Sequence, residues 1–325
     1  MTRIPRRTIV AAAAAFAAAS WLAPASAQPA GKPITLYVPA APGGTTDIAA
    51  RMLSVPLAKV LHQPVVVENR SGGNGNIAGQ LVARAPADGT TLLVQYSGYQ
   101  CITPLIQPVQ GFDPGKDLKP IGMLVDSPQL LVTRGNFPAN SFAEFLKYAK
   151  AHPGSVNYAS SGNGSLQHVT TEMLKDLTKT FMVHIPYRGT GPAMSDLLAG
   201  TVDFTITTPP PVLAQVRAGK LKALMTTGRT RLEALPNVPT AMEQGVPLVA
   251  SSWFAVYGPA GLPAETQNRL SAAIRQIVQS EDFRKKAEDL GAKAVAMNAS
   301  ELATLGDNER NMWARIVHAA NIKAD

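Results

Sequence analysis

The sequence predicts an α/β fold made of two lobes, and three observations indicate it. Short apolar runs of strand length alternate with helical patterns along nearly the whole chain, which is typical of helices packed on mostly parallel sheets. The chain has 325 residues, a length that exceeds one small core and fits two domains of ordinary size. Apolar residues make up 46% of it, which excludes a disordered chain.

The first 27 residues have the three parts of a secretory signal peptide. Arg3, Arg6 and Arg7 precede an apolar run at 9–19, and the segment ends on small residues at 25–27. The run is 11 residues long, whereas a membrane span needs about 20, so a membrane anchor is disfavoured. We expect cleavage after Ala27 and a mature protein in the periplasm, exported by the general or the twin-arginine pathway.

The expected strands are short apolar runs bounded by turn residues. In chain order they are 34–38, 65–68, 91–95, 121–125, 130–133, 156–159, 182–185, 202–206, 221–226, 253–257 and 293–296.

The expected helices carry apolar residues at three-to-four spacing, which gives each one a buried face. On the last of them Leu302, Leu305 and Trp313 form such a face, and Asn298 with Glu301 is a helix-capping pattern. In chain order the helices are 45–61, 77–84, 141–151, 166–178, 191–199, 211–218, 239–244, 264–278, 282–290 and 300–320.

The order of these elements predicts that the chain passes twice between the lobes, near 126–128 and near 249–252. Residues 28–127 and 252–325 would then form the first lobe, and residues 128–251 the second. Turn-rich segments at 113–120 and 236–247 precede the two passages.

Charge and cysteine content exclude several classes of function. Removal of the signal peptide lowers the formal charge from +8 to +5, with 27 Lys and Arg against 22 Asp and Glu. Bases alternate with acids, as at 284–289, so the sequence has no basic stripe for nucleic acid. Cys101 is alone, which excludes a disulfide framework and a multi-cysteine metal site, and we expect it to be a buried apolar residue.

The sequence contains no enzyme signature that we recognise. The five histidines lack HExxH or Cys/His spacing, and there is no nucleophile elbow or phosphate-binding loop of the GxxxxGK[ST] type. The glycines at 73–79 approach a dinucleotide fingerprint, but the third glycine comes one residue late. We therefore expect no catalytic residue, no metal ligand and no cofactor.

Four loops rich in Gly, Ser, Thr and Asn lie between an expected strand and an expected helix, at 42–47, 71–76, 160–165 and 187–192. Small residues let backbone N–H groups approach a ligand, and the start of a helix favours an anion. For 71–76 an ordinary turn is the better interpretation. The other three loops predict an anion clamp supplied from both lobes.

Seven segments together resemble one family, the periplasmic solute receptors of tripartite tricarboxylate transporters, known as the Bug family. They are VPAAPGGTTD at 38–47, VVENR at 66–70, ADGTTL at 87–92, NYASSGNGS at 157–165, IPYRG at 185–189, AGKLKAL at 218–224 and LPNVPT at 235–240. Each is unspecific alone, but their shared order covers the whole mature chain.

The resemblance implies a periplasmic-binding-protein fold whose two α/β lobes close on one small mono- or dicarboxylate, aliphatic or aromatic, without covalent chemistry. It implies a monomer that passes its solute to large and small permease subunits, with no nucleic-acid partner. The alternatives are the input module of a membrane sensor and, as a weaker one, a secreted hydrolase or lyase. The candidate ligand-binding residues are Ala40, Ala41, Gly43, Gly44, Thr45, Asp47, Ser97, Ser160, Ser161, Gly164, Ser165, His168, Tyr187, Arg188, Gly189, Thr190, Thr207 and Thr208.

Several residues have a structural interpretation beside the functional one. Asp47 is favoured as a stabiliser of the first helical turn, and His168 as a neutral hydrogen-bonding group. Similar proteins often carry an acid close to position 207, and Thr207 here argues against an amino-acid ligand. Tyr96 and Ser97 follow a strand and are expected to line the wall of the first lobe, whereas Trp253 and Phe254 are expected in the core.

Overall fold

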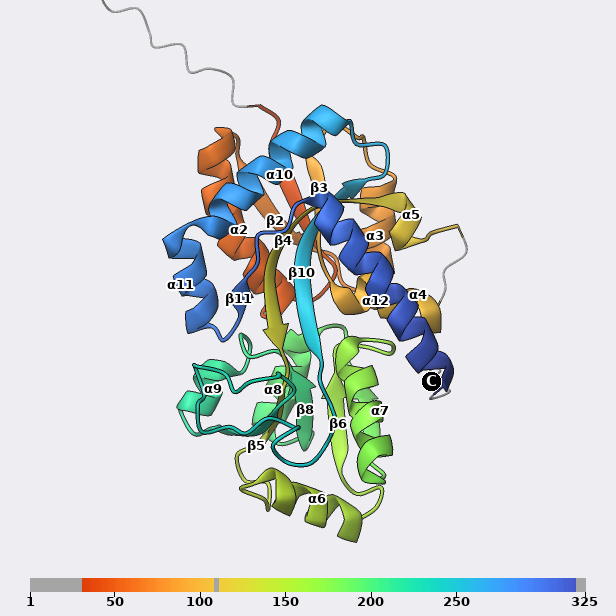
Figure 1. Cartoon of the computed structure of the whole chain (residues 1–325), viewed down its shortest axis with the longest axis vertical. Coiled ribbons are helices and arrows are strands. Elements are labelled where there is room, and N and C mark those ends of the chain that lie inside the picture. Colours follow the sequence, from red (N-terminus) through yellow and green to blue (C-terminus); the bar gives the residue numbers. More distant parts are fainter. Residues whose placement is uncertain (1–30, 108–110, 320–325) are drawn as a thin grey trace, which may run out of the picture. The chain divides into compact units, whose positions relative to one another are not determined.

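The computed structural model describes residues 31–107 and 111–319 (Figure 1). The predicted signal peptide at 1–27 lies outside the described residues.

The first sheet has six strands in the order β11-β4-β10-β3-β1-β2. Their bounds are β1 Ile34–Val38, β2 Val65–Asn69, β3 Thr91–Tyr96, β4 Leu118–Pro128, β10 Ser251–Pro259 and β11 Lys293–Ala294. Strand β1 runs parallel to β2 and β3, and β10 runs antiparallel to β3 and β4. Along β1 the fully buried residues Ile34, Leu36 and Val38 share one face of the sheet, and Thr35 and Tyr37 on the other face are partly exposed.

Helices cover both faces of the first sheet, with α2, α10 and α11 on the left of Figure 1 and α3, α4 and α12 on the right. Their bounds are α2 Thr45–Leu61, η1 Gly73–Gly75, α3 Asn76–Ala83, η2 Gly98–Ile102, α4 Thr103–Ile106, α5 Pro114–Asp117, α10 Ala264–Gln279, α11 Glu281–Asp289 and α12 Ala299–Ala319. Cys101 is buried as expected, and its Sγ faces the carbonyl oxygen of Gly306 on α12.

The second sheet has five strands in the order β7-β6-β8-β5-β9. Their bounds are β5 Leu130–Arg134, β6 Asn157–Ser160, β7 Val183–Pro186, β8 Phe204–Thr207 and β9 Leu221–Thr226, and the associated helices are α6 Phe142–Ala151, α7 Leu166–Thr178, α8 Thr190–Ala199 and α9 Leu213–Arg217. An aromatic core that includes Phe142, Phe145 and Phe204 fills one side, and a smaller cluster that includes Met194 and Leu197 fills the other.

Two expectations about the elements were wrong. The sheets are mixed rather than mostly parallel, because β10 pairs antiparallel with its neighbours in the first sheet and β5 with its neighbours in the second. The expected helix at 239–244 is instead a turn, in which Thr240 accepts a hydrogen bond from the Glu243 N–H and the Glu243 carboxylate accepts one from Thr240 N–H. These mutual bonds close one turn, which then ends at Gly245 in a positive-φ conformation.

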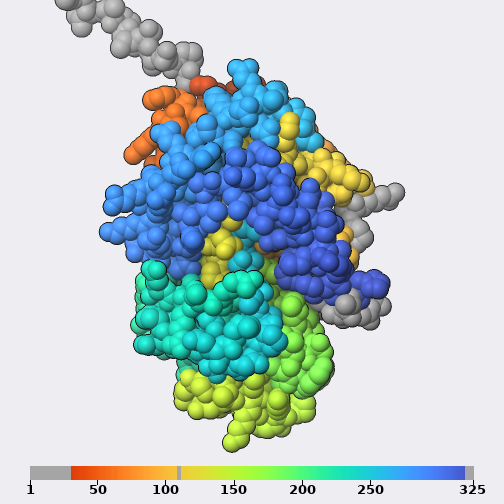
Figure 2. Space-filling model, viewed as in Figure 1, coloured from red at the N-terminus to blue at the C-terminus, as the bar shows by residue number. Residues whose placement is uncertain are grey.

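Two connections join the sheets, and the first of them is very short. Strand β4 of the first sheet leads into β5 of the second through one residue, Gln129, and the chain returns from β9 to β10 through residues 227–250. Thr227 joins the two connections, because its Oγ1 accepts from Gln129 N–H (2.9 Å) and donates to the Ala250 carbonyl oxygen (2.6 Å). In Figure 2 the yellow residues of β4 and the light blue residues of β10 are visible in a hollow at this junction.

None of the helices in the described ranges is both long enough and apolar enough to cross a bilayer.

Candidate functional site

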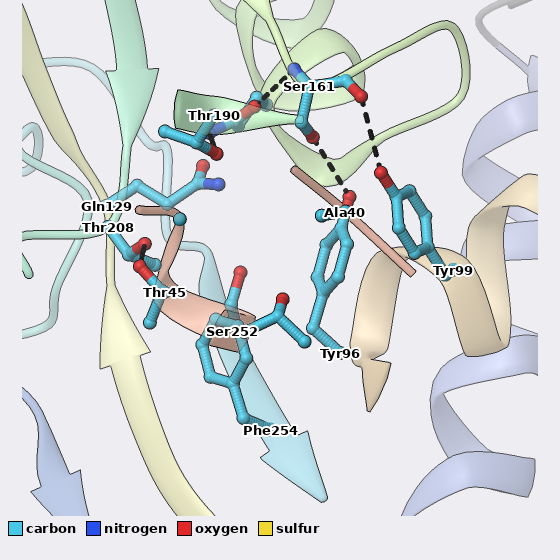
Figure 3. Close-up of a pocket in the computed structure, with 13 residues that line it drawn as sticks. Ala40, Thr45, Tyr96, Tyr99, Gln129, Ser161, Thr190, Thr208, Ser252 and Phe254 are labelled. Atoms are coloured by element: carbon cyan, nitrogen blue, oxygen red, sulfur yellow. Dashed lines mark hydrogen bonds between the residues drawn. The ribbon is translucent and has the colours of Figure 1, made fainter. Parts of the chain in front are cut away.

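A small cavity of about 30 Å³ is lined by residues from both sheets (Figure 3). The first sheet and its loops contribute Ala40, Gly44, Thr45, Thr46, Tyr96, Tyr99, Ser252 and Phe254, the second contributes Ser161, Gln167, Thr190 and Thr208, and Gln129 lies at the junction. The lining consists of hydroxyl, amide, aromatic and small groups, and no Asp, Glu, Lys, Arg or His belongs to it.

Three helices begin at this cavity. Gly44 is the N-cap of α2 and is followed by Thr45 and Thr46, Gln167 lies in the first turn of α7, and Thr190 is the first residue of α8. The first N–H groups of a helix have no intrahelical acceptor and carry partial positive charge. The cavity therefore offers favourable positions for an anion although its side chains are neutral.

Asp47 fixes the loop that leads into α2. Its carboxylate accepts hydrogen bonds from the Gly43 N–H (3.0 Å), Arg51 Nε (3.1 Å) and Asn69 Nδ2 (3.0 Å). Burial works to raise the pKa of Asp47, but these hydrogen bonds outweigh it, so the pKa lies below its usual value. Asp47 is thus an ionised structural acid, and it lines neither this cavity nor the second one described below.

Gln167 organises the side of the cavity that belongs to the second sheet. Its Oε1 accepts from Ser161 N–H (2.5 Å), and its Nε2 donates to Thr190 Oγ1 (3.1 Å) and Thr207 Oγ1 (2.7 Å). One amide therefore holds together the loop after β6, the start of α8 and the end of β8. Thr207 is fully buried beneath it and does not line the cavity, whereas its neighbour Thr208 does.

Three aromatic rings form the opposite wall. The Tyr96 ring centroid lies 4.5 Å from that of Tyr99 and 5.9 Å from that of Phe254. Burial raises the pKa of Tyr99 to about 12 and that of Tyr96 well above its ordinary value, so both phenols stay protonated and neutral. In Figure 3 both hydroxyls point toward Ser161, where Tyr99 donates to the carbonyl oxygen (3.3 Å).

Hydrogen bonds join the loops of the two sheets around the cavity. Thr45 Oγ1 and Thr208 Oγ1 are 2.5 Å apart, and Ala41 N–H donates to the Arg188 carbonyl oxygen (3.3 Å). Gly191 of α8 also lies directly against the backbone of Pro42. The two sheets are therefore held together at the cavity by contacts between their loops.

A second cavity, of about 200 Å³, is adjacent to the first and shares Tyr99 and Ser161 with it. The loop at 71–74 lines it together with Pro39, Ile77, Tyr187 and Arg188. The Tyr187 hydroxyl donates to Asp196 (2.6 Å), and burial together with this carboxylate raises the pKa of Tyr187 to about 12. The loop that was interpreted as an ordinary turn therefore lies at a cavity, and Asn74 also donates to the Asn163 carbonyl oxygen (2.5 Å).

The predicted site residues divide into three groups. The first cavity is lined by Ala40, Gly44, Thr45, Ser161, Thr190 and Thr208, and the second by Ser161, Tyr187 and Arg188. The remaining residues line neither: Ala41, Gly43, Asp47, Ser97, Ser160, Gly164, Ser165, His168, Gly189 and Thr207.

Several residues of the third group support the loops. Ser165 caps α7 by accepting from His168 N–H, and His168 Nδ1 accepts from Gly164 N–H (3.1 Å). Gly189 has φ +112°, and a Cβ there would lie 3.0 Å from the Ala41 nitrogen, so it permits the close approach of the two loops.

Sequence reasoning did not include Thr46, Tyr99, Gln129, Gln167, Ser252 or Phe254 among the site residues. Phe254 was expected in the core, and it is buried but also lines the cavity. Thr46 belongs to the Gly/Thr loop that the sequence did single out, whereas Gln129 and Gln167 lie in no motif that marked them.

Within residues 31–107 and 111–319, no group of three or more His, Cys, Asp or Glu is placed to hold a metal ion. The lining of the cavity suits a small organic molecule rather than a cation.

Two mixed α/β sheets linked by two crossings, with a cavity at their junction, define a periplasmic-binding-protein fold, as the resemblance implied. A family model described as "Tripartite tricarboxylate transporter family receptor" matches residues 49–322. The chain belongs to this family of solute-binding receptors, which are not enzymes, and the resemblance to the Bug family is confirmed.

The chain is similar to several named relatives and solved structures. Protein BugT of Bordetella pertussis is 36% identical, over 95% of this chain and 95% of its own length. The structure of MatC from Rhodopseudomonas palustris with bound malate is 33% identical with a TM-score of 0.84, over 88% of this chain and 99% of that one. The structure of R. palustris Rpa4515 with adipate is 32% identical with a TM-score of 0.88, over 91% and 99%.

Proposed function

We propose that this protein is a periplasmic receptor that binds a small organic carboxylate in the cavity at the junction of its two sheets. The observation that carries the proposal is the meeting of three helix N-termini at a lining without charged side chains. Helix ends and hydroxyls stabilise a carboxylate, whereas a cationic ligand would be buried there without a counter-charge. The relatives with bound malate and adipate support the same class of ligand.

Binding requires the two sheets to separate and close again. A cavity of about 30 Å³ has room for only a few water molecules. We infer two lobes, 28–127 with 252–325 and 128–251, that open at the junction and close around the ligand. The contacts between Thr45 and Thr208 and between Ala41 and Arg188 form on closure, so a ligand that favours the closed form shifts the population toward it.

Micromolar affinity corresponds to about 8 kcal/mol. Helix ends contribute up to about 2 kcal/mol each when partly buried, and hydrogen bonds to a charged group contribute about 1.5–3 kcal/mol each. Three helix starts and the hydroxyls of the lining can therefore supply the free energy of micromolar binding without an arginine or lysine in the cavity.

The second part of the proposal is delivery. A receptor of this family captures its solute outside the cytoplasmic membrane, and we propose that it passes the solute to the membrane subunits of a tripartite tricarboxylate transporter. The signal-peptide pattern at 1–27 supports a periplasmic location.

The test is a thermal-shift screen of the mature protein with mono- and dicarboxylates, amino acids and sugars, followed by calorimetry of each hit. We expect stabilisation by carboxylates alone, at micromolar dissociation constants. Stabilisation only by sugars or only by amino acids would contradict the proposal. Receptor-dependent uptake of the bound carboxylate by cells that express the permease subunits tests delivery, and binding without uptake would contradict it.

A further inference from the structure

Gln129 has a buried side chain whose amide oxygen is unpaired. The residue is 1% exposed and lines the first cavity, and its Oε1 has no hydrogen-bond partner among the residues that the structure describes. Figure 3 shows the side chain extending from the junction into the cavity, with its amide on the side of Thr190. An unpaired buried acceptor is unfavourable, so a ligand that supplies a donor at this position gains affinity.

The backbone of Gln129 is fixed on both sides. Its N–H donates to Thr227 Oγ1 (2.9 Å), and its carbonyl oxygen accepts from Thr227 N–H (2.8 Å) and Thr226 Oγ1 (3.1 Å). Because Thr227 also binds Ala250 in the returning connection, the backbone of Gln129 is held by both connections between the sheets. These bonds fix the point from which the side chain extends into the cavity.

The chemistry of the amide restricts its partner. A carboxylate has only acceptor atoms and can pair with Nε2 but not with Oε1. An O–H or N–H group of the ligand can supply the missing donor, and an ammonium group would be buried here without a counter-charge, since no lining residue is acidic. A neutral hydroxyl on the carbon next to the carboxylate matches the adjacent donor and acceptor of the amide, whichever way the amide is turned.

We propose that the Gln129 amide selects 2-hydroxycarboxylates, by accepting a hydrogen bond from the hydroxyl and donating one to the adjacent carboxylate. This proposal rests on the proposed function of the cavity as a carboxylate site.

The test is calorimetry of the mature protein with ligand pairs that differ only in the 2-hydroxyl: lactate and propionate, malate and succinate, 2-hydroxyadipate and adipate. We expect the hydroxylated member of each binding pair to bind about tenfold more tightly, which is about 1.4 kcal/mol. In Gln129→Met, which keeps the length but removes both polar atoms, the ratio falls to about one. The matched control is Gln276→Met on the exposed face of α10, which retains the wild-type ratio.

Equal affinities within the pairs for the wild-type protein would overturn the proposal without requiring any variant to fold. If Gln129→Met binds both members of a pair more weakly by the same factor, the affinity ratio is unchanged. That result would also overturn the proposal and would leave Gln129 a merely structural role. Absence of binding by every carboxylate would refute the proposed function itself, and this proposal with it. Binding of carboxylates without preference for the hydroxyl refutes only the role of Gln129.

Discussion

Replacing Gly191 by alanine is expected to weaken ligand binding while the fold keeps its stability. Gly191 is the second residue of α8, and a Cβ there would lie 2.1 Å from the carbonyl oxygen of Pro42, in the loop after β1. Real Cβ contacts essentially never fall below 3.0 Å, so the closed arrangement of the two loops cannot accept the methyl group unchanged. Opening of the sheets relieves the clash, because the two atoms belong to different sheets.

The size of the effect follows from the cost of overpacking. Extra methyl groups in close-packed positions cost about 1–3 kcal/mol. If this cost falls only on the closed form, the dissociation constant increases about 5- to 150-fold, at 1.4 kcal/mol per factor of ten. Alanine is at least as favourable as glycine within a helix, so the free energy of unfolding should be unchanged or higher.

The assay is calorimetry with the tightest-binding carboxylate of the screen, together with urea unfolding of the free protein. Gly306→Ala is the matched control, since this glycine also lies in a helix and a Cβ there meets nothing within 4 Å. Wild-type affinity for Gly191→Ala would refute the inference that binding needs the Pro42 and Gly191 segments in contact. A loss of affinity that appears equally in Gly306→Ala would do the same.

Three further predictions concern the junction, the C-terminal helix and the second cavity. Thr227→Val leaves the Gln129 N–H and the Ala250 carbonyl oxygen without their hydroxyl partner, and it should lower the free energy of unfolding in urea by about 1–3 kcal/mol. Burial raises the pKa of Glu309 on α12 to about 7, and the nearby Asp126 adds to this shift. The protonated form of Glu309 therefore stabilises the fold at low pH. This contribution to the free energy of unfolding disappears as the pH rises from about 4.5 to about 7. Glu309→Gln should abolish that decrease, of about 3 kcal/mol, in unfolding curves measured at each pH. Arg188→Ala should weaken adipate binding by up to about fivefold and leave a short monocarboxylate unaffected in calorimetry, because only the longer ligand can reach the second cavity.

The loops of the site were largely predictable from the sequence. Gly43 and Gly189 adopt positive φ, and glycine is the residue that reaches this conformation at no cost, so their positions at strand-to-helix turns carried real information. The hydroxyl residues next to them, Thr45 and Thr190, then follow at the first turns of α2 and α8.

The wall and the junction were not predictable in the same way. Tyr96 was expected at the wall because it ends a strand, and it lines the cavity, whereas Phe254, its partner in register on the neighbouring strand, was expected in the core. Buried aromatic residues on strands have the same sequence pattern in a core as at a cavity. The role of Gln129 depends on the single-residue connection between β4 and β5, which is a property of tertiary pairing. The antiparallel direction of β10 likewise depends on how distant segments pair rather than on local preference.

The central claim, that a carboxylate binds at the start of α2 between the two sheets, is tested most directly by a crystal structure of the mature protein with the tightest-binding carboxylate. We predict ligand density bounded by Thr45, Tyr96, Gln129 and Thr208, with a carboxylate oxygen within hydrogen-bond distance of an N–H group in the first turn of α2. Ligand density at another surface of the protein, such as the cavity of about 350 Å³ beside Arg284 and Lys293, would contradict the account.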